Sequence, residues 1–195
     1  MNSELSLGRT EDIELLNWLR QPATLDRGFR ALLERYQEPL YWHIRRMVTD
    51  HEDTNDVLQN VLVKVFRNIQ KFEGKSSLYT WLYRIATNET LTFLQQRKRK
   101  KVESLDSEQL MVAEQLRADP YFDGSAAQVR LQQALTTLPE KQRLVFSMRY
   151  FEGMPYQAIS DILDTSVGAL KASYHHAVKK IEHFIMTHGA DNFRQ

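Results

Sequence analysis

Residues 155–181 are predicted to form two short helices separated by a tight turn, and this pattern constrains the fold more than any other stretch. In the first segment apolar residues recur at helical spacing, at Tyr156, Ile159, Ile162 and Leu163. Residues 164–166 interrupt the pattern, and Ser166 is a favourable cap for a helix that begins at Val167. The arrangement is typical of a helix-turn-helix.

The second of these helices is predicted to carry two contrasting faces. One side is apolar, with Val167, Leu170, Tyr174, Ala177, Val178 and Ile181. The other is small, basic and rich in imidazole, with Gly168, Lys171, Ala172, His175, His176 and Lys179. Such a face suits the DNA major groove, where a helix must approach base edges and phosphates closely. The alternative is an ordinary helical hairpin with a solvated basic face.

The composition is that of a folded, mainly helical protein. Hydrophobic residues make up 42% of the 195 residues, and 7 glycines and 5 prolines leave few breaks. The absence of cysteine excludes disulfides and cysteine-based zinc sites and favours a reducing cytoplasm. No apolar run approaches the roughly 18 residues that cross a bilayer, and the polar start is no signal peptide. No direct membrane insertion is therefore expected.

Two helices near the start of the chain, at residues 11–20 and 25–48, are expected to be scaffold. Residues 11–20 and 25–48 carry apolar side chains at helical spacing. Pro39 is expected to begin a separate helix within the second range, because proline at the first helical position loses no helix hydrogen bond.

Residues 53–71 are predicted to form a helix with a wide buried face. Its apolar residues are Val57, Leu58, Val61, Leu62, Val65, Phe66 and Ile69. The opposite side carries Asp56, Gln59 and Asn60, with Val63 as the one apolar residue among them. This side is either a solvated face or a docking strip, in which an acid and amides flank a small apolar contact. Periodicity does not choose between the two.

A break at residues 72–77 leads into a helix predicted over 78–101, which ends in the basic run RKRKK at 97–101. Aromatic, hydroxyl and amide side chains beside a basic cluster are the groups that handle a nucleic-acid strand. Trp81 and Tyr83 belong either to this surface or to the core.

Residues 102–127 are mainly acidic and weakly periodic, which predicts a linker between two domains. The second domain is expected to start at Gln128, with Pro139 beginning a new helix within it. The predicted fold class is therefore all-α, with two small helical domains, residues 1–101 and 128–195, joined by that linker.

Motifs along the chain resemble those of one family. They are D-x-x-D-V-L-Q at 53–59, F-x-G-x-S-x-x-x-x-W-L-x-x-I-A-x-N at 72–88, LP-x-x-Q-R-x-V-F-x-x-R-Y-F-E-G-x-x-Y-x-x-I at 138–159 and S-V-G-x-L-K at 166–171. Together they resemble bacterial RNA polymerase sigma factors of the extracytoplasmic-function class, in the sigma-70 family. The resemblance covers about 11–101 and 128–186, and four motifs in order are far more specific than any one of them.

The resemblance implies a factor that binds RNA polymerase core and directs promoter recognition, strand opening and transcription initiation for a stress or envelope-signal regulon. The first domain would hold the β′ clamp helices and open the −10 element, taking up single-stranded DNA. The second would contact the β flap and read the −35 element as duplex. The linker would follow the RNA exit path. An anti-sigma factor, often membrane-anchored, would hold such a protein inactive.

Carried over residue by residue, the resemblance assigns three sets of contacts. The polymerase-binding set is Asp56, Gln59, Asn60 and Val63. The −10 set is Phe72, Lys75, Ser76, Ser77, Asn88 and Arg97. The −35 set is Ser166, Lys171, Ala172, Ser173, His175, His176 and Lys179. Lys171 and the two histidines are expected at base edges, and Lys179 with its neighbour Lys180 at phosphate.

The chain departs from the family pattern at several positions. Asn60 stands where a second carboxylate is common, which reduces the docking charge. Thr92 and Gln95 stand where an Asp and an Arg are common. Arg to guanine is the commonest specific major-groove contact, and the recognition helix lacks the usual Arg residues. A −35 element unlike the usual one is therefore expected.

No cofactor, metal or catalytic residue is expected, and no ATP-hydrolysing motif is present in the sequence. A stand-alone helix-turn-helix regulator is a competing hypothesis, but it leaves the docking strip and the 72–88 motif unexplained. A metal-dependent hydrolase using His175, His176 and His183 is a third, disfavoured because adjacent helical residues diverge by about 100°.

Overall fold

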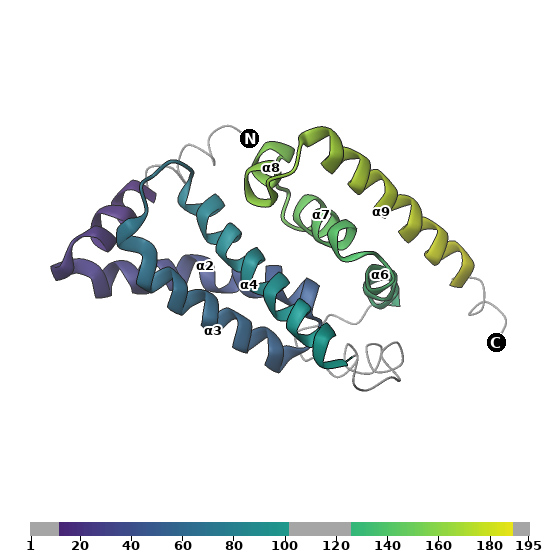
Figure 1. Cartoon of the computed structure of the whole chain (residues 1–195), viewed down its shortest axis with the longest axis horizontal. Helices are drawn as coiled ribbons and strands as arrows, with labels where there is room; N and C mark the ends of the chain where they lie inside the picture. The colour runs from purple at the N-terminus through teal and green to yellow at the C-terminus, as the bar shows by residue number, and fades with distance from the viewer. Residues whose placement is uncertain (1–11, 102–125, 189–195) are drawn as a thin grey trace.

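The computed structural model describes residues 12–101 and 126–188, and within these ranges every regular element is a helix. A helix at residues 12–20 precedes η1 (Pro22–Thr24), α2 (Leu25–Val48), α3 (His51–Asn68), η2 (Ile69–Lys71) and α4 (Leu78–Lys101). The second group is α6 (Ala126–Thr136), α7 (Glu140–Tyr150), α8 (Tyr156–Leu163) and α9 (Val167–His188). Figure 1 shows the two groups side by side. The predicted all-α class is confirmed.

The N-terminal domain is built on α2, α3 and α4, which pack against one another. Thr49 takes a left-handed backbone conformation (φ 68°) and ends α2. Asp50 then begins α3, because its carboxylate accepts a hydrogen bond from the Asp53 backbone N–H at 2.9 Å. Two residues therefore reverse the chain, and α3 lies beside α2.

The prediction of a helix start at Pro39 is wrong, because α2 runs through it from Leu25 to Val48. Pro39 is exposed, whereas its neighbours Tyr36 and Leu40 are 5% and 0% exposed. The missing backbone hydrogen bond thus falls on the solvent side, where a helix can bend away from its core. Packing of the buried face keeps the helix continuous.

The predicted apolar face of α3 is mostly buried. Val57, Val61, Val65 and the following Ile69 are each at most 2% exposed. Phe66 departs from the prediction, since it is 45% exposed and rests its ring edge-on against Phe29, with the centroids 5.0 Å apart. Helical periodicity overestimated the width of the face at this one position.

The C-terminal domain folds α6, α7, α8 and α9 around a small core of its own, which includes Leu135, Phe146 and Ala177. Pro139 immediately precedes α7, as predicted. Asp164 ends α8 in the left-handed conformation (φ 48°). The Ser166 Oγ then accepts a hydrogen bond from the Ala169 N–H at 3.3 Å, which confirms the predicted cap of α9.

The two domains are in direct contact. Helix α2 packs against α7, and α4 packs against α8. One apolar core continues across the contact, with Leu82 from the N-terminal domain and Met148 and Ile159 from the C-terminal domain. The predicted linker lies almost wholly outside the described residues, and α6 begins two residues before the expected start at Gln128. In the part of the chain that the structure describes, no helix is both long and apolar enough to span a membrane.

Candidate nucleic-acid interface

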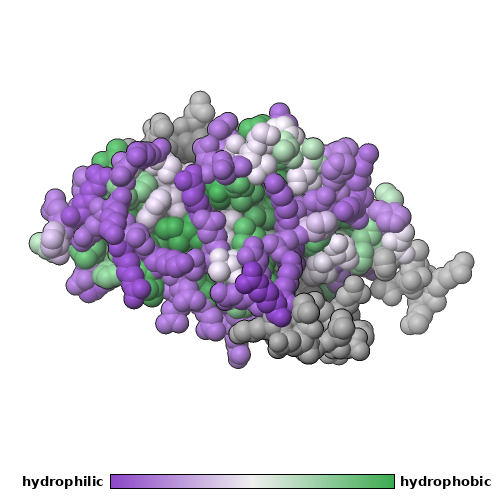
Figure 2. All heavy atoms as spheres, in the orientation of Figure 1, coloured by the Kyte–Doolittle hydropathy of each residue, from purple (hydrophilic) through white to green (hydrophobic). Residues whose placement is uncertain are grey.

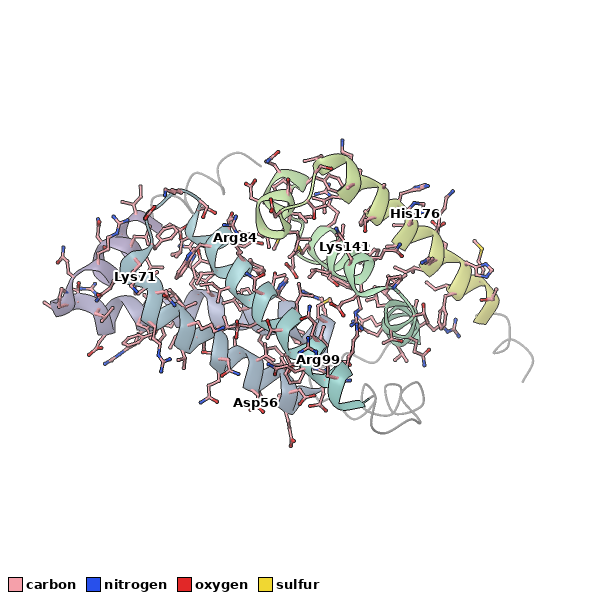
Figure 3. The ribbon with its side chains drawn as sticks, in the orientation of Figure 1. Asp56, Lys71, Arg84, Arg99, Lys141 and His176 are labelled. Atoms are coloured by element: carbon pink, nitrogen blue, oxygen red, sulfur yellow. The ribbon has the colours of Figure 1, made fainter. Side chains whose placement is uncertain are left out.

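The predicted docking strip lies on the outward face of α3. Asp56, Gln59 and Asn60 are exposed, and Val63 is 42% exposed. Their exposure follows from the helical period, because the opposite face of α3 is held in the core. Figure 3 shows Asp56 pointing away from the body of the molecule. The strip is therefore an open surface with one carboxylate, two amides and an apolar side chain.

The loop after η2 is anchored at its first residue. Phe72 is 6% exposed, and its ring lies 5.2 Å from that of Trp81, centroid to centroid. The Arg20 guanidinium donates a hydrogen bond to the Phe72 carbonyl at 3.2 Å. Gly74 follows with φ 74°, a conformation that favours glycine. The buried ring of Phe72 therefore anchors the start of the loop, and Trp81 covers that ring.

The tip of the loop presents hydroxyl and amino groups. Lys75 has an 86% exposed side chain and pairs with Glu73. Ser76 is half-buried. Ser77 is exposed, and its Oγ accepts a hydrogen bond from the Thr80 N–H at 3.0 Å, which caps the start of α4. The tip of the loop can offer a cation and hydroxyls to a partner while Phe72, at the start of the loop, stays anchored.

Helix α4 carries both open and engaged polar residues. Asn88 is exposed on the outward face, which is hydrophilic in Figure 2, while hydrophobic side chains show between α4 and the helices beside it. Lys98 forms an ion pair with Glu140 of α7 at 2.6 Å. Arg97 is bound to Asp53 at the start of α3, at 3.2 Å. The basic end of α4 is thus partly tied to its own protein.

Helix α9 has the two faces that the sequence predicts. The back is packed, with Leu170 and Ala177 0% exposed and Ile181 6% exposed. The residues of the opposite face are all exposed, and they are Gly168, Lys171, Ala172, His175, His176 and Lys179. Ser173 is half-buried at the edge between the faces. Figure 3 shows His176 on the outer side of α9, away from α7.

The ring of Tyr174 orients α9 from behind. It stacks on Phe146 of α7 with centroids 5.7 Å apart and planes 12° apart. It also meets Tyr156 of α8 edge-on at 6.4 Å. Burial raises the pKa of Tyr174, so its phenol stays neutral near pH 7. These aromatic contacts hold the helix-turn-helix angle that presents the basic face.

The geometry of the adjacent histidines bears on the hydrolase hypothesis. The rings of His175 and His176 lie 6.0 Å apart and are tilted by 56°. Across the described ranges, 12–101 and 126–188, no group of three or more His, Cys, Asp or Glu side chains could hold a metal ion. The hydrolase hypothesis therefore gains no support from this geometry.

Sequence reasoning missed the polar residues that join the domains. Arg84 of α4 donates a hydrogen bond to the Asp161 backbone carbonyl of α8. His43 is 0% exposed and binds Glu152. The one available signal was the placement of His43 among Leu40, Ile44 and Met47 on an apolar face, which indicates burial but not the partner.

Comparisons with known proteins agree with this geometry. Residues 32–100 match the family model for sigma-70 region 2, and residues 128–181 match that for sigma-70 region 4. The chain is 30% identical over 167 residues to the ECF RNA polymerase sigma-E factor of Haemophilus influenzae, covering 82% of this chain and 88% of that protein. It is 29% identical to the RNA polymerase sigma-H factor of Pseudomonas aeruginosa, covering 80% and 85% of the two chains.

Solved structures share the fold at low sequence identity. The sigma factor RpoE, from its complex with the anti-sigma factor NepR of Bartonella quintana, superposes with a TM-score of 0.68 at 21% identity, covering 82% of this chain and 98% of that one. CnrH, from its complex with the cytosolic domain of CnrY, gives 0.65 at 20%, covering 91% and 98%. Region 2 coincides with α2 to α4, and region 4 with α6 to α9. The chain therefore belongs to the sigma-70 family, as an extracytoplasmic-function sigma factor for promoter recognition in transcription initiation.

Proposed function

We propose that the two domains divide the work of initiation between them. Residues 1–101 bind polymerase core and open the −10 element, residues 128–195 read the −35 element, and residues 102–127 connect them. The observation that carries this proposal is the position of the open polar surfaces. One lies on α3 within the region 2 match, and the other lies on α9 within the region 4 match.

The α3 strip is the proposed contact for the β′ clamp helices of polymerase. Asp56 supplies charge, Gln59 and Asn60 supply hydrogen bonds, and Val63 supplies a small apolar contact. All four are exposed in the free chain, so binding requires no rearrangement of α3 itself. A charged group at the edge of an interface, such as the Asp56 carboxylate, contributes more to the association rate and to selectivity than to affinity.

The loop at 72–77 and the outward face of α4 are the proposed −10 surface. Lys75 and Ser77 are exposed at the loop tip, and Asn88 is exposed on the helix. In this conformation Phe72 and Arg97 support the surface from within, through Trp81 and Asp53. A base flipped from the non-template strand would meet hydroxyls for its edge and a cation for its phosphate.

The outward face of α9 is the proposed −35 reader. Lys171, His175 and His176 are placed for base edges and Lys179 for phosphate, while Ala172 and Gly168 permit close approach of the helix to the groove. Ser166 and Ser173 flank this face. The combination has no arginine, so the bidentate contact to guanine is not available from these positions.

Strand opening draws on binding free energy alone in this scheme, and we assign no reaction to the chain itself. Unstacking a base costs a few kcal/mol. Phosphate contacts by lysines and base contacts in the loop must together offset that cost. Polymerase and promoter are cytoplasmic, and that is where we place the chain.

An anti-sigma factor is the proposed inhibitor. Two structural neighbours were solved with one, RpoE with NepR and CnrH with the cytosolic domain of CnrY. Coverage of the α3 strip would be enough to block polymerase binding. The β flap is a further proposed contact, on the C-terminal domain.

Transcription from purified components tests the function. Polymerase core with this chain, given total genomic DNA, should yield transcripts whose start sites share sequences near −10 and −35. Core alone is the control, and a mixture that starts no additional transcripts would refute the proposal. A stand-alone regulator would instead bind duplex DNA through α9 and fail to elute with core.

A further inference from the structure

A polar cluster lies buried where the two domains meet, and we call His43, Arg46, Thr87 and Glu152 the interdomain cluster. The His43 Nδ1 lies 3.0 Å from the Glu152 Oε1, and the His43 Nε2 lies 3.0 Å from the Thr87 Oγ1. The Arg46 Nη1 donates to the same Glu152 oxygen at 3.4 Å. Glu152 is the only member from the C-terminal domain, so it joins that domain to α2 and α4.

The cluster is removed from solvent. The side chain of His43 is 0% exposed and that of Glu152 is 6% exposed. The other oxygen of Glu152, Oε2, is buried and has no hydrogen-bond partner among the described residues. A buried carboxylate is costly unless paired. Glu152 therefore depends on His43 and Arg46 for its place in the fold.

The remaining groups around Glu152 come from α4 and from its own turn. Tyr79 and Tyr83 face it from α4. Burial raises the pKa of both phenols, and the Glu152 charge adds to the effect. The guanidinium carbon of Arg46 lies 4.6 Å from the ring centroid of Phe151. The Glu152 carboxylate thus faces the Arg46 guanidinium, two phenols and an imidazole.

Other interactions also hold the two domains together, and they differ in how exposed they are to solvent. Apolar residues of both domains share one core, as described for Leu82, Met148 and Ile159. At the margin, Lys98 and Glu140 form an ion pair with side chains 69% and 24% exposed. Exposed pairs of this kind contribute little, so the margin supplies a matched comparison for the buried cluster.

We propose that Glu152 is a latch that holds the free chain closed and must leave the interdomain cluster when the chain engages a promoter. The closed state follows from the contacts alone, whereas the need to open rests on the proposed function. Opening would also release α4, because Arg84 is held at α8 through the Asp161 carbonyl. Figure 3 shows Arg84 on the side of α4 that faces the C-terminal domain.

Helix packing shows why one closed shape cannot serve both promoter elements. Helix α8 packs against α4 on one side and against α9 on the other. At 8–10 Å between packed axes, α4 and α9 are roughly 20 Å apart. The −35 and −10 elements are about 25 base pairs apart by their names, or roughly 85 Å of duplex at 3.4 Å per pair. The domains must therefore separate to read both.

Spin labels can measure the closure directly, because the chain has no native cysteine. Glu34→Cys on α2 and Glu182→Cys on α9 are both at exposed positions. The labelled full-length chain should give one narrow distance distribution. Adding Glu152→Ala should raise the ratio of open to closed molecules at least about a hundredfold, as expected for loss of a buried ion-pair partner. Glu140→Ala, at the exposed pair, should change it less than about fivefold.

A folding control keeps the test decisive. Circular dichroism should show unchanged helix content in each variant. If Glu152→Ala loses helix, Glu152→Gln replaces it, since the amide keeps the shape and a hydrogen bond to His43 but removes the charge that pairs with Arg46. A broad distribution in the wild-type chain, or no opening in a folded Glu152 variant, would overturn the proposal.

Addition of polymerase core separates this proposal from the proposed function. Core should lengthen the label distance in the wild-type chain. If Glu152→Ala opens the free chain but core neither binds nor transcribes, the latch stands and the promoter function fails. If transcription proceeds and neither core nor Glu152→Ala moves the distance, the latch fails and the function stands.

Discussion

Arg97, near the end of α4, is bound to Asp53, in the first turn of α3, with 3.2 Å between the guanidinium Nη1 and the carboxylate Oδ2. The same guanidinium lies 3.4 Å from the Val48 carbonyl at the end of α2. One side chain therefore ties together α2, α3 and α4 of the N-terminal domain. A role for Arg97 at −10 DNA competes with this structural one.

Asp53→Asn and Arg97→Ala should separate the two roles. If Arg97 binds DNA, Asp53→Asn removes its ion pair within the protein and should leave −10 strand binding unchanged or stronger. Arg97→Ala should weaken binding about tenfold, the loss of one charge-assisted contact. Fluorescence anisotropy with a −10 non-template oligonucleotide and the holoenzyme measures both. Equal weakening by the two variants would assign Arg97 to structure alone.

Asp56→Arg should reduce the affinity for polymerase core at least tenfold. Placing a like charge at a complementary interface costs several kcal/mol, and about 1.4 kcal/mol is a factor of ten. The free energy of unfolding should stay within about 0.5 kcal/mol, because Asp56 is exposed.

Glu34→Arg is the matched control for this variant, with the same charge change at an exposed site on α2. It should leave core binding unchanged in a competition assay. Equal loss in both variants would mean that overall charge, and not the α3 strip, governs docking.

Lys179→Ala should weaken −35 duplex binding uniformly across sequences and lower the slope of log affinity against log salt by about one. Lys179 is exposed on the outward face of α9, where a phosphate contact releases one counterion. Titrations of the holoenzyme at several salt concentrations measure the slope. Lys71→Ala, at an exposed lysine of η2, is the control and should leave the slope unchanged. An unchanged slope for Lys179→Ala would show that Lys179 makes no phosphate contact.

Stability should fall at alkaline pH through the tyrosines near Glu152. Burial, with the Glu152 charge, raises the pKa of Tyr79 to about 12, against about 10 in an unfolded chain. The folded state thus favours the neutral phenol, so the contribution is complete below pH 10 and is lost as pH rises to about 12. Tyr79→Phe should flatten urea-measured stability over that range. An equally steep loss in Tyr79→Phe would exclude Tyr79 as the cause.

Local features of the sequence predicted most of the elements. The alternation of faces in α9, the cap at Ser166 and the helix start after Pro139 each depend on neighbouring residues, and the structure confirms all three. Pro39 was misassigned because its local preference is outweighed by packing of Tyr36 and Leu40 against the rest of the domain. A prediction from neighbouring residues does not include packing against residues that are distant in the sequence.

The contact between domains could not be predicted, for the same reason. His43 and Glu152 are 109 residues apart in the chain, and nothing in the period of either helix links them. The family motif includes Glu152 without indicating its partner. Likewise, the motif nominates Phe72 as a DNA contact, while only the structure shows its ring covered by Trp81.

The outward face of α9 contributes no side chain to the apolar cores found in the described residues. Substitutions at such exposed positions usually alter folding free energy by no more than about 0.5 kcal/mol. Lys171, Ala172 and His176 are thus open to replacement while the interior stays the same. If this face reads the −35 element, as proposed, exchanging a few of these surface residues would change which promoters are recognised, with no compensating change required in the apolar cores of the described residues.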